Sequence, residues 1–179
     1  MDTTKSCRVL VVEDEGLIAL DIAGRLEALG HEIVAITGTA EEAVERAAGA
    51  DVVLMDIRLD GRMDGVEAAA QIRERHHLPV IFLTAHADRA TLDRAKLACP
   101  FGYIVKPLAA SLKTSIEIAL YKHGMERRLE ESEALMRTTL SSVADAVVVT
   151  DAAGRVLMLN RAAEGLTGSE AFRSRNHSC

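Results

Sequence analysis

Short aliphatic runs alternate with longer amphipathic stretches over the first two-thirds of the chain. Five runs are apolar at consecutive positions, as in parallel strands covered on both faces; they lie at about 8–12, 32–36, 51–55, 79–83 and 102–105. Helical stretches are expected between and after them, at about 16–29, 40–48, 64–76, 88–97 and from 110 onward. This alternation predicts a doubly wound α/β fold with right-handed crossovers.

The first helical stretch carries an apolar stripe. Leu17, Leu20, Ala23 and Leu26 recur at helical spacing and predict its buried face, and Gly30 supplies a stop signal.

Three later helices have N-cap signals. Thr39 is followed three residues later by Glu42, a capping-box pattern, while Asp64 and Asp88 precede the third and fourth helical stretches.

The fifth helical stretch shows no clear stop. Met125, Leu129 and Met136 lie near heptad spacing, but the polar Ser132 and Thr139 interrupt the seam. A short coiled coil and a solvated single helix both fit this pattern.

A different pattern follows the long helix. Two apolar runs, 146–150 and 155–159, flank a turn that contains Gly154 and predict a β-hairpin, after which Asn160 can cap a short helix through Leu166.

Bulk properties narrow the class of protein. The chain has 179 residues, which is enough for one domain and part of another, and only 3% of them are aromatic, so the core must be aliphatic. The formal net charge of −6 argues against nucleic-acid binding.

Cys7, Cys99 and Cys179 are too widely spaced for a metal site or a disulfide framework. With no signal-peptide pattern in 1–6 and no apolar run near the ~18 residues of a membrane span, a cytoplasmic protein is expected.

Polar side chains end four of the five predicted strands. The carboxyl ends of parallel strands share one edge of the sheet, which is where open α/β sheets bind ligands. The residues at these ends are Glu13 and Asp14, Asp56, Thr84, and Lys106 with Pro107. Clustered carboxylates repel one another, so a divalent cation is the natural compensation, and ligands that are all oxygen favour Mg²⁺. Asp56 is then a candidate nucleophile toward an activated phosphoryl group, with Lys106 and Thr84 as donors to its oxygens.

Residues 8–122 closely resemble the receiver domain of two-component response regulators. The resemblance is carried by Val-Val-Glu13-Asp14-Glu, Leu-Met-Asp56-Ile, Leu-Thr84-Ala and Gly-Tyr103-Ile-Val-Lys106-Pro107. It implies a flavodoxin-like five-stranded sheet in the order 2-1-3-4-5, a fold for which a receiver protein is a standard example. It also implies that Asp56 accepts a phosphoryl group from a histidine kinase or a histidine phosphotransfer protein.

The resemblance further implies a role for each residue of the site. Asp14, Asp56 and the backbone carbonyl of Arg58 would bind Mg²⁺ directly, and Glu13 would act mainly through water. Thr84 and Tyr103 would form the switch pair that reshapes the face made by the fourth helix, fifth strand and fifth helix.

Arg58 and His86 each lie two residues beyond a residue of the site. They are either solvated loop residues or side chains that overhang the acyl phosphate and tune its lifetime.

Residues 139–168 resemble the start of a PAS sensor domain. The matching features are Asp145-Ala-Val-Val-Val-Thr-Asp-Ala-Ala-Gly154 and Asn160-Arg-Ala-Ala-Glu164-Gly-Leu-Thr167-Gly168. A complete PAS domain needs roughly a hundred residues, so only part of one is present here. The expected organisation is a receiver domain over 7–122, a helical linker over 123–138 and a partial, incomplete PAS-like α+β segment over 139–179.

A phosphorelay response regulator that signals through its C-terminal helix, as a homodimer without direct DNA binding, is therefore the leading expectation. It is not expected to be an enzyme beyond phosphotransfer and slow self-dephosphorylation. One alternative is an aspartate-nucleophile phosphohydrolase; such enzymes usually carry a second Asp two residues after the nucleophile, where this chain has Arg58. The other alternative is a phosphorylation-independent interaction module.

Overall fold

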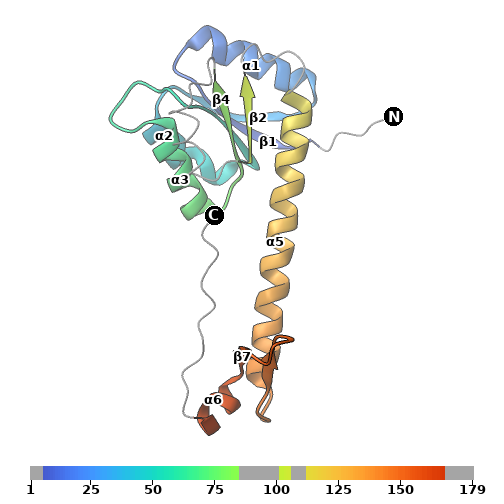
Figure 1. The fold of residues 1–179 in the computed structure, drawn as a ribbon. Helices are drawn as coiled ribbons and strands as arrows, with labels where there is room; N and C mark the ends of the chain where they lie inside the picture. The colour runs from blue at the N-terminus through green and yellow to red at the C-terminus, as the bar shows by residue number, and fades with distance from the viewer. Residues whose placement is uncertain (1–5, 85–100, 106–111, 168–179) are drawn as a thin grey trace. The chain divides into compact units, whose positions relative to one another are not determined.

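A five-stranded parallel sheet forms the centre of the N-terminal part of the protein (Figure 1). The computed structural model describes residues 6–84, 101–105 and 112–167. The strand order is β2-β1-β3-β4-β5, as expected. The strands are β1 (Arg8–Val12), β2 (Glu32–Thr37), β3 (Val52–Asp56), β4 (Val80–Thr84) and β5 (Gly102–Val105). Each predicted strand is thus confirmed to within one residue.

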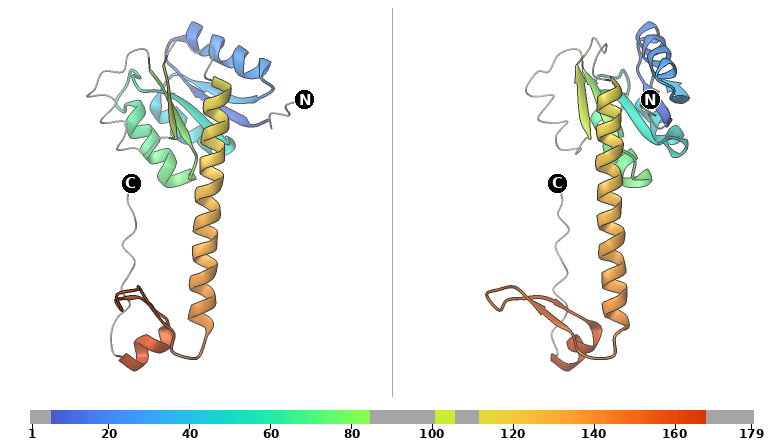
Figure 2. Two further views of the ribbon diagram at one scale, coloured as in Figure 1. Left: turned by 45° about the vertical axis from the view of Figure 1, so that its right-hand side comes forward. Right: turned by 90° about the vertical axis from the view of Figure 1, so that its right-hand side faces the viewer.

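Helices cover both faces of this sheet (Figure 2). They are α1 (Gly16–Ala28), α2 (Ala40–Arg46) with the 3-10 turn η1 (Ala47–Gly49), α3 (Gly65–His76) and α5 (Leu112–Ser142). The helix predicted at 88–97, with Asp88 as its cap, lies outside the described residues.

The strands divide their side chains between two apolar cores. Val9 and Val11 of β1 belong to the cluster that includes Ile22 of α1 and Ile116 of α5. The intervening Leu10 and Val12 belong instead to the cluster that includes residues of α2 and α3. Alternate residues of a strand point to opposite faces, so a run that is apolar throughout fills both cores.

The buried face of α1 differs from the predicted one. Leu17 and Leu20 are 86% and 64% exposed, whereas Ala19 and Ile22 lie in the core beside the correctly predicted Ala23 and Leu26. A repeat of three residues falls about 60° short of a full helical turn at each step. The stripe from Leu17 to Leu26 therefore winds around α1, and only its later half reaches the sheet.

The N-cap predictions at Thr39 and Asp64 are confirmed. The Thr39 side chain accepts a hydrogen bond from the backbone amide of Glu42 at 3.4 Å. The Asp64 side chain accepts from the amides of Val66 and Glu67, and the Glu67 side chain accepts from the Asp64 amide, which completes a capping box. These caps set the starting points of α2 and α3.

The chain divides into two compact units, residues 1–124 and 125–179, with the boundary inside α5. In the second unit, β6 (Val148–Thr150) and β7 (Val156–Leu159) pair as an antiparallel hairpin, followed by α6 (Arg161–Thr167). Among the described residues, no helix combines the length and the apolar character needed to cross a membrane.

The Asn160 side chain links several segments of the second unit through hydrogen bonds. It is 4% exposed, and both ends of its side-chain amide are engaged. Its oxygen accepts hydrogen bonds from the backbone amides of Val147 and Ala163, and its nitrogen donates to the carbonyls of Leu140, Val143 and Asp145. The predicted cap of α6 therefore also holds the end of α5 and the start of the hairpin.

A thiol–imidazole pair lies in the core of the first unit. The Cys7 sulfur is 3.2 Å from Nδ1 of His31, and both residues are buried. Burial, with a smaller contribution from the charge of Asp51, raises the pKa of Cys7 from 9.0 to about 11. Burial lowers the pKa of His31, against the opposing charge of Glu117. Both groups are therefore held neutral near pH 8.

We expect the free energy of unfolding to fall as the pH rises from 9 to 11. The unfolded chain releases the Cys7 proton near pH 9, whereas the folded chain keeps it until about pH 11, so alkali favours unfolding. The loss should be at most about 2–3 kcal/mol. Urea unfolding at pH 8 and pH 10.5 measures it. Cys7→Ala should weaken this slope, and an unchanged slope in that variant would contradict the assignment.

Candidate functional site

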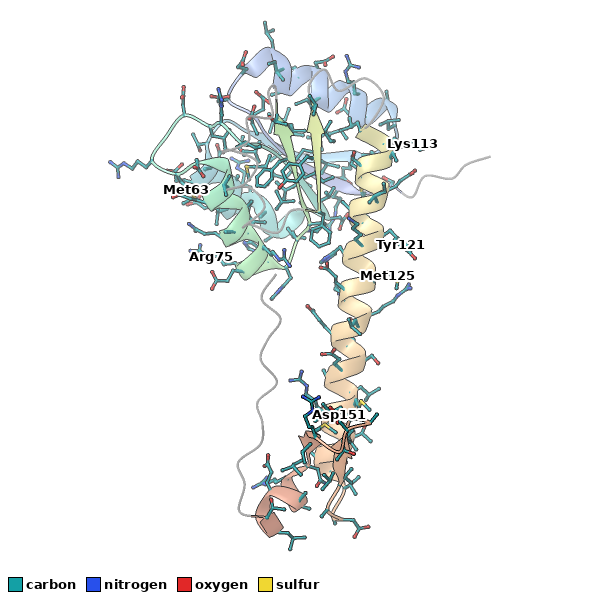
Figure 3. The ribbon with its side chains drawn as sticks, in the orientation of Figure 1. Met63, Arg75, Lys113, Tyr121, Met125 and Asp151 are labelled. Atoms are coloured by element: carbon teal, nitrogen blue, oxygen red, sulfur yellow. The ribbon has the colours of Figure 1, made fainter. Side chains whose placement is uncertain are left out.

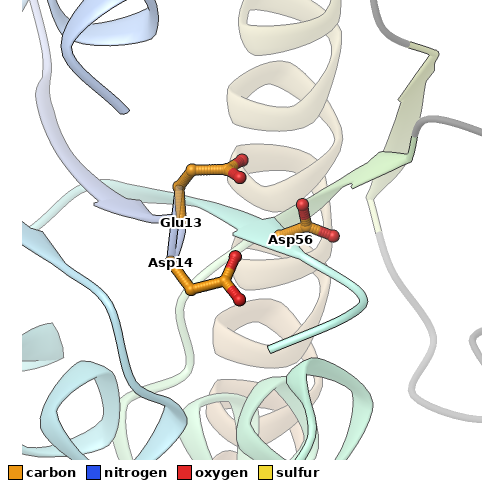
Figure 4. Close-up of side chains that lie close together, drawn as sticks. All are labelled: Glu13, Asp14 and Asp56. Atoms are coloured by element: carbon orange, nitrogen blue, oxygen red, sulfur yellow. The ribbon is translucent and has the colours of Figure 1, made fainter. Parts of the chain in front are cut away.

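Three carboxylates meet at the carboxyl edge of the sheet (Figure 4). Glu13 and Asp14 follow the last residue of β1, and Asp56 is the last residue of β3. β1 and β3 are parallel neighbours in which Val12 pairs with Met55, so the next residues, Glu13 and Asp56, lie side by side. One carboxylate oxygen from each of the three residues lies within 4.8 Å of the others. The predicted convergence of these acids is thus present in the fold.

The cluster combines buried and exposed acids. Glu13 and Asp56 are 2% and 9% exposed, whereas Asp14 is exposed to solvent. Burial removes water that would otherwise screen their repulsion, so a bound cation is the effective way to stabilise all three in the ionised form. The donors are all oxygen and one of them faces solvent, which fits Mg²⁺, an ion that uses few carboxylates and keeps several waters.

The loop after β3 fixes the Asp56 carboxylate. The backbone amide of Arg58 donates a hydrogen bond of 2.9 Å to Oδ1 of Asp56. The amide of Ile57 donates to the carbonyl of Leu83 at 3.3 Å, which holds the start of the loop against β4. A carboxylate held in this way needs little reorganisation to present its other oxygen to a reacting group.

Two further predicted residues occupy the neighbouring strands. Thr84 is the last residue of β4, directly beside β3, and it is buried. Tyr103 lies on β5, half-buried against the α2–α3 core, with its ring centroid 5.9 Å from that of Phe82. Lys106 and His86 lie outside the described residues.

Gly65 is a residue of this site that sequence reasoning missed. It is the first residue of α3, and its amide donates to the carbonyl of Ile57 at 3.3 Å. A Cβ at this position would lie 2.0 Å from the backbone oxygen of Asp56, far inside contact distance. The absence of a side chain therefore lets α3 begin directly beneath the Asp56 loop. The only sequence signal was a glycine immediately after the Asp64 cap.

Comparisons with known proteins agree with this geometry. The family model described as "Response regulator receiver domain" matches residues 9–117. The transcriptional regulatory protein PdtaR of Mycobacterium tuberculosis is 36% identical over 169 residues, which cover 93% of this chain and 78% of that protein.

Two solved structures are also similar. The signal receiver domain of a modulated diguanylate cyclase from Desulfovibrio desulfuricans G20 is 43% identical with a TM-score of 0.65, and the match covers 68% of this chain and 98% of that one. The receiver domain of a sensor histidine kinase from Pseudomonas aeruginosa PAO1 is 27% identical with a TM-score of 0.55, over 65% of this chain and 96% of that one. That structure has a magnesium ion coordinated in its active site cleft.

Gly65→Ala should damage both the fold and the acidic cluster, because the added methyl group must displace the Asp56 backbone. We expect a loss of about 1–3 kcal/mol in the free energy of unfolding, measured by urea titration, and weaker Mg²⁺ binding by calorimetry. Gly24→Ala is the matched control, since no atom lies within 4 Å of its Cβ position in α1. That change should stabilise the protein by about 0.5–1 kcal/mol. Equal behaviour of the two variants would refute the role given to Gly65.

Proposed function

This chain belongs to the response regulator receiver domain family, and on that premise we propose that Asp56 is its phosphoacceptor in a two-component phosphorelay. The observation that carries the proposal is the convergence of Glu13, Asp14 and Asp56 within 4.8 Å. The donor would be a phosphohistidine of a histidine kinase or a phosphotransfer protein. The 7–122 segment would be the receiver domain that performs this reaction.

The proposed step is a displacement at phosphorus. A carboxylate oxygen of Asp56 forms the new bond to phosphorus while the bond from phosphorus to the donor histidine nitrogen breaks, and that nitrogen keeps the electron pair. The product is an acyl phosphate on Asp56. The Arg58 amide orients the attacking carboxylate through its bond to Oδ1. Lys106 and Thr84 would contact the phosphoryl oxygens.

The metal ligands would be Asp14, Asp56 and the carbonyl of Arg58, with Glu13 acting through water. Bound there, Mg²⁺ would neutralise charge on the transferring phosphoryl group. The three acids would hold the ion at the sheet edge, because the cation would relieve their mutual repulsion.

Phosphorylation would act as a switch. Thr84 would turn toward the phosphoryl group, and Tyr103 would rotate further inward from its half-buried position near Phe82. This movement biases a two-state equilibrium at the face that includes β5 and α5. The signal would then pass along the 123–138 linker to the partial PAS-like segment at 139–179, within a homodimer.

A switch fits the site better than a phosphohydrolase. Position 58, where a hydrolase would place its acid–base carboxylate, carries an arginine whose amide already holds Asp56. We propose that Arg58, together with His86, instead sets the lifetime of the acyl phosphate.

The exposed leucines of α1 offer a docking contact for the phosphodonor. Leu17 and Leu20 lie only a few residues after Asp14 in the sequence, and they are 86% and 64% exposed. An exposed apolar pair in the helix that follows the acidic residues suits a protein partner that buries it during transfer.

Incubation with acetyl phosphate and Mg²⁺ should add one phosphoryl group to the protein, detected by intact mass. Asp56→Asn should abolish the gain, because the amide is not a nucleophile toward phosphorus. Asp60→Asn, which changes an exposed acid in the same loop, is the control and should leave the gain unchanged. Unmodified wild-type protein with acetyl phosphate and with phosphoramidate would refute the proposal.

Leu20→Ser should separate the docking contact from the chemistry. We expect transfer from a phosphorylated protein donor to slow by about tenfold, the size of one lost interface anchor. The rate with acetyl phosphate, which needs no docking surface, should not change. Leu166→Ser, at an exposed leucine of α6, serves as the control. Equal slowing with both donors would show that Leu20 supports the fold and not docking.

A further inference from the structure

The second half of α5 carries an exposed seam at heptad spacing. Its five positions alternate by four and three residues along the helix, and each is exposed to solvent. These seam residues are Met125, Leu129, Ser132, Met136 and Thr139. Met125, labelled in Figure 3, projects from the helix, and Leu129 and Met136 are 60% and 62% exposed. Such a stripe has the period of a two-stranded coiled coil.

The face of the same segment that lies away from the seam carries charged, solvent-exposed side chains. Arg127 pairs with Glu131 at 3.0 Å, and both side chains are largely exposed. In the heptad that contains the seam, these residues occupy positions f and c, which point away from a partner helix. The Arg127–Glu131 ion pair therefore lies on the face of the helix away from the seam.

The polar seam position Thr139 is compatible with burial. Its hydroxyl donates a hydrogen bond of 2.8 Å to the carbonyl of Leu135 in the same helix. A hydroxyl already satisfied within its own helix does not carry an unpaired donor into an interface, so its methyl group can pack there.

We propose that residues 125–142 form a parallel, two-stranded coiled coil with a second copy of this chain. In parallel pairing, each g position faces the e position five residues later on the other helix. Arg128 at g then meets the partner subunit's Glu133 at e, a pair of opposite charges. Leu135 at g meets the partner subunit's Leu140, so the second flanking pair is apolar.

Antiparallel pairing is disfavoured by the same flanks. That orientation places e positions against e positions. The e row holds Glu126, Glu133 and Leu140, so acids would face acids or a leucine. The arrangement of charges therefore favours the parallel orientation.

This coiled coil would be the interface of the homodimer in the proposed function, and in that sense it rests on the proposed function. It concerns only residues 125–142 and does not require phosphorylation. The Asp56→Asn variant of the full chain therefore tests the coiled coil separately from the phosphoacceptor assay.

The first experiment is sedimentation velocity of this full-length variant over a range of concentrations. We expect dimers, and Arg128→Glu should weaken dimerisation by about tenfold, since two attractive pairs become repulsive. Arg127→Glu makes the same change of charge at an outward position and should have little effect on the dimer. The double variant Arg128→Glu/Glu133→Arg should recover most of the loss. Monomers or trimers of the parent, or equal effects at 127 and 128, would overturn the proposal.

Disulfide crosslinking tests the orientation. In a Cys99→Ser/Cys179→Ser background, Ser132→Cys should form an intermolecular disulfide rapidly, because a parallel in-register seam brings position 132 against its own copy. Ala134→Cys, at the outward f position, should crosslink at least about tenfold more slowly. Circular dichroism confirms that both variants keep their helix content. Equal crosslinking at the two positions would overturn the parallel register.

Discussion

The parallel pairing of β1 with β3 forces three carboxyl groups together against their mutual repulsion. Glu13 and Asp56 lie in adjacent strands at the same sheet edge, and Asp14 follows directly. The aliphatic cores on both faces of the sheet hold this arrangement, because the strands cannot separate without exposing them. The fold thus maintains a concentration of negative charge, which favours the binding of a divalent cation at this edge of the sheet.

Local backbone geometry makes the cluster usable. The Arg58 amide holds one oxygen of Asp56, and Gly65 lets α3 start directly against the Asp56 backbone. Both contacts act on the loop between β3 and α3, so the position of the Asp56 carboxylate depends on how that helix begins. The Asp64 capping box fixes the beginning of α3 and so belongs to the same support.

Sequence patterns were reliable where a local rule fixes the structure. The strands, the Thr39 and Asp64 caps and the meeting of Glu13, Asp14 and Asp56 follow from hydrophobic period, capping chemistry and parallel topology. The buried face of α1 was misjudged at Leu17 and Leu20, because a three-residue repeat winds around a helix. Gly65 was missed because its importance lies in a through-space distance to Asp56, which no local pattern encodes. The roles of the site residues stay predictions, and two of these residues, Lys106 and His86, lie outside the described residues.

The five hydrogen bonds of Asn160 have a mechanical consequence. One side chain joins the last turn of α5 to the first residues of the hairpin and of α6. Unwinding of the last turn of α5 would break the hydrogen bond from the Asn160 amide to the Leu140 carbonyl, and the same side chain also anchors the hairpin and α6. A rotation of the C-terminal end of α5 would therefore turn the hairpin and α6 with it, and would not be lost through local unwinding of the helix end. Asn160 thus couples the end of α5 mechanically to the hairpin and to α6.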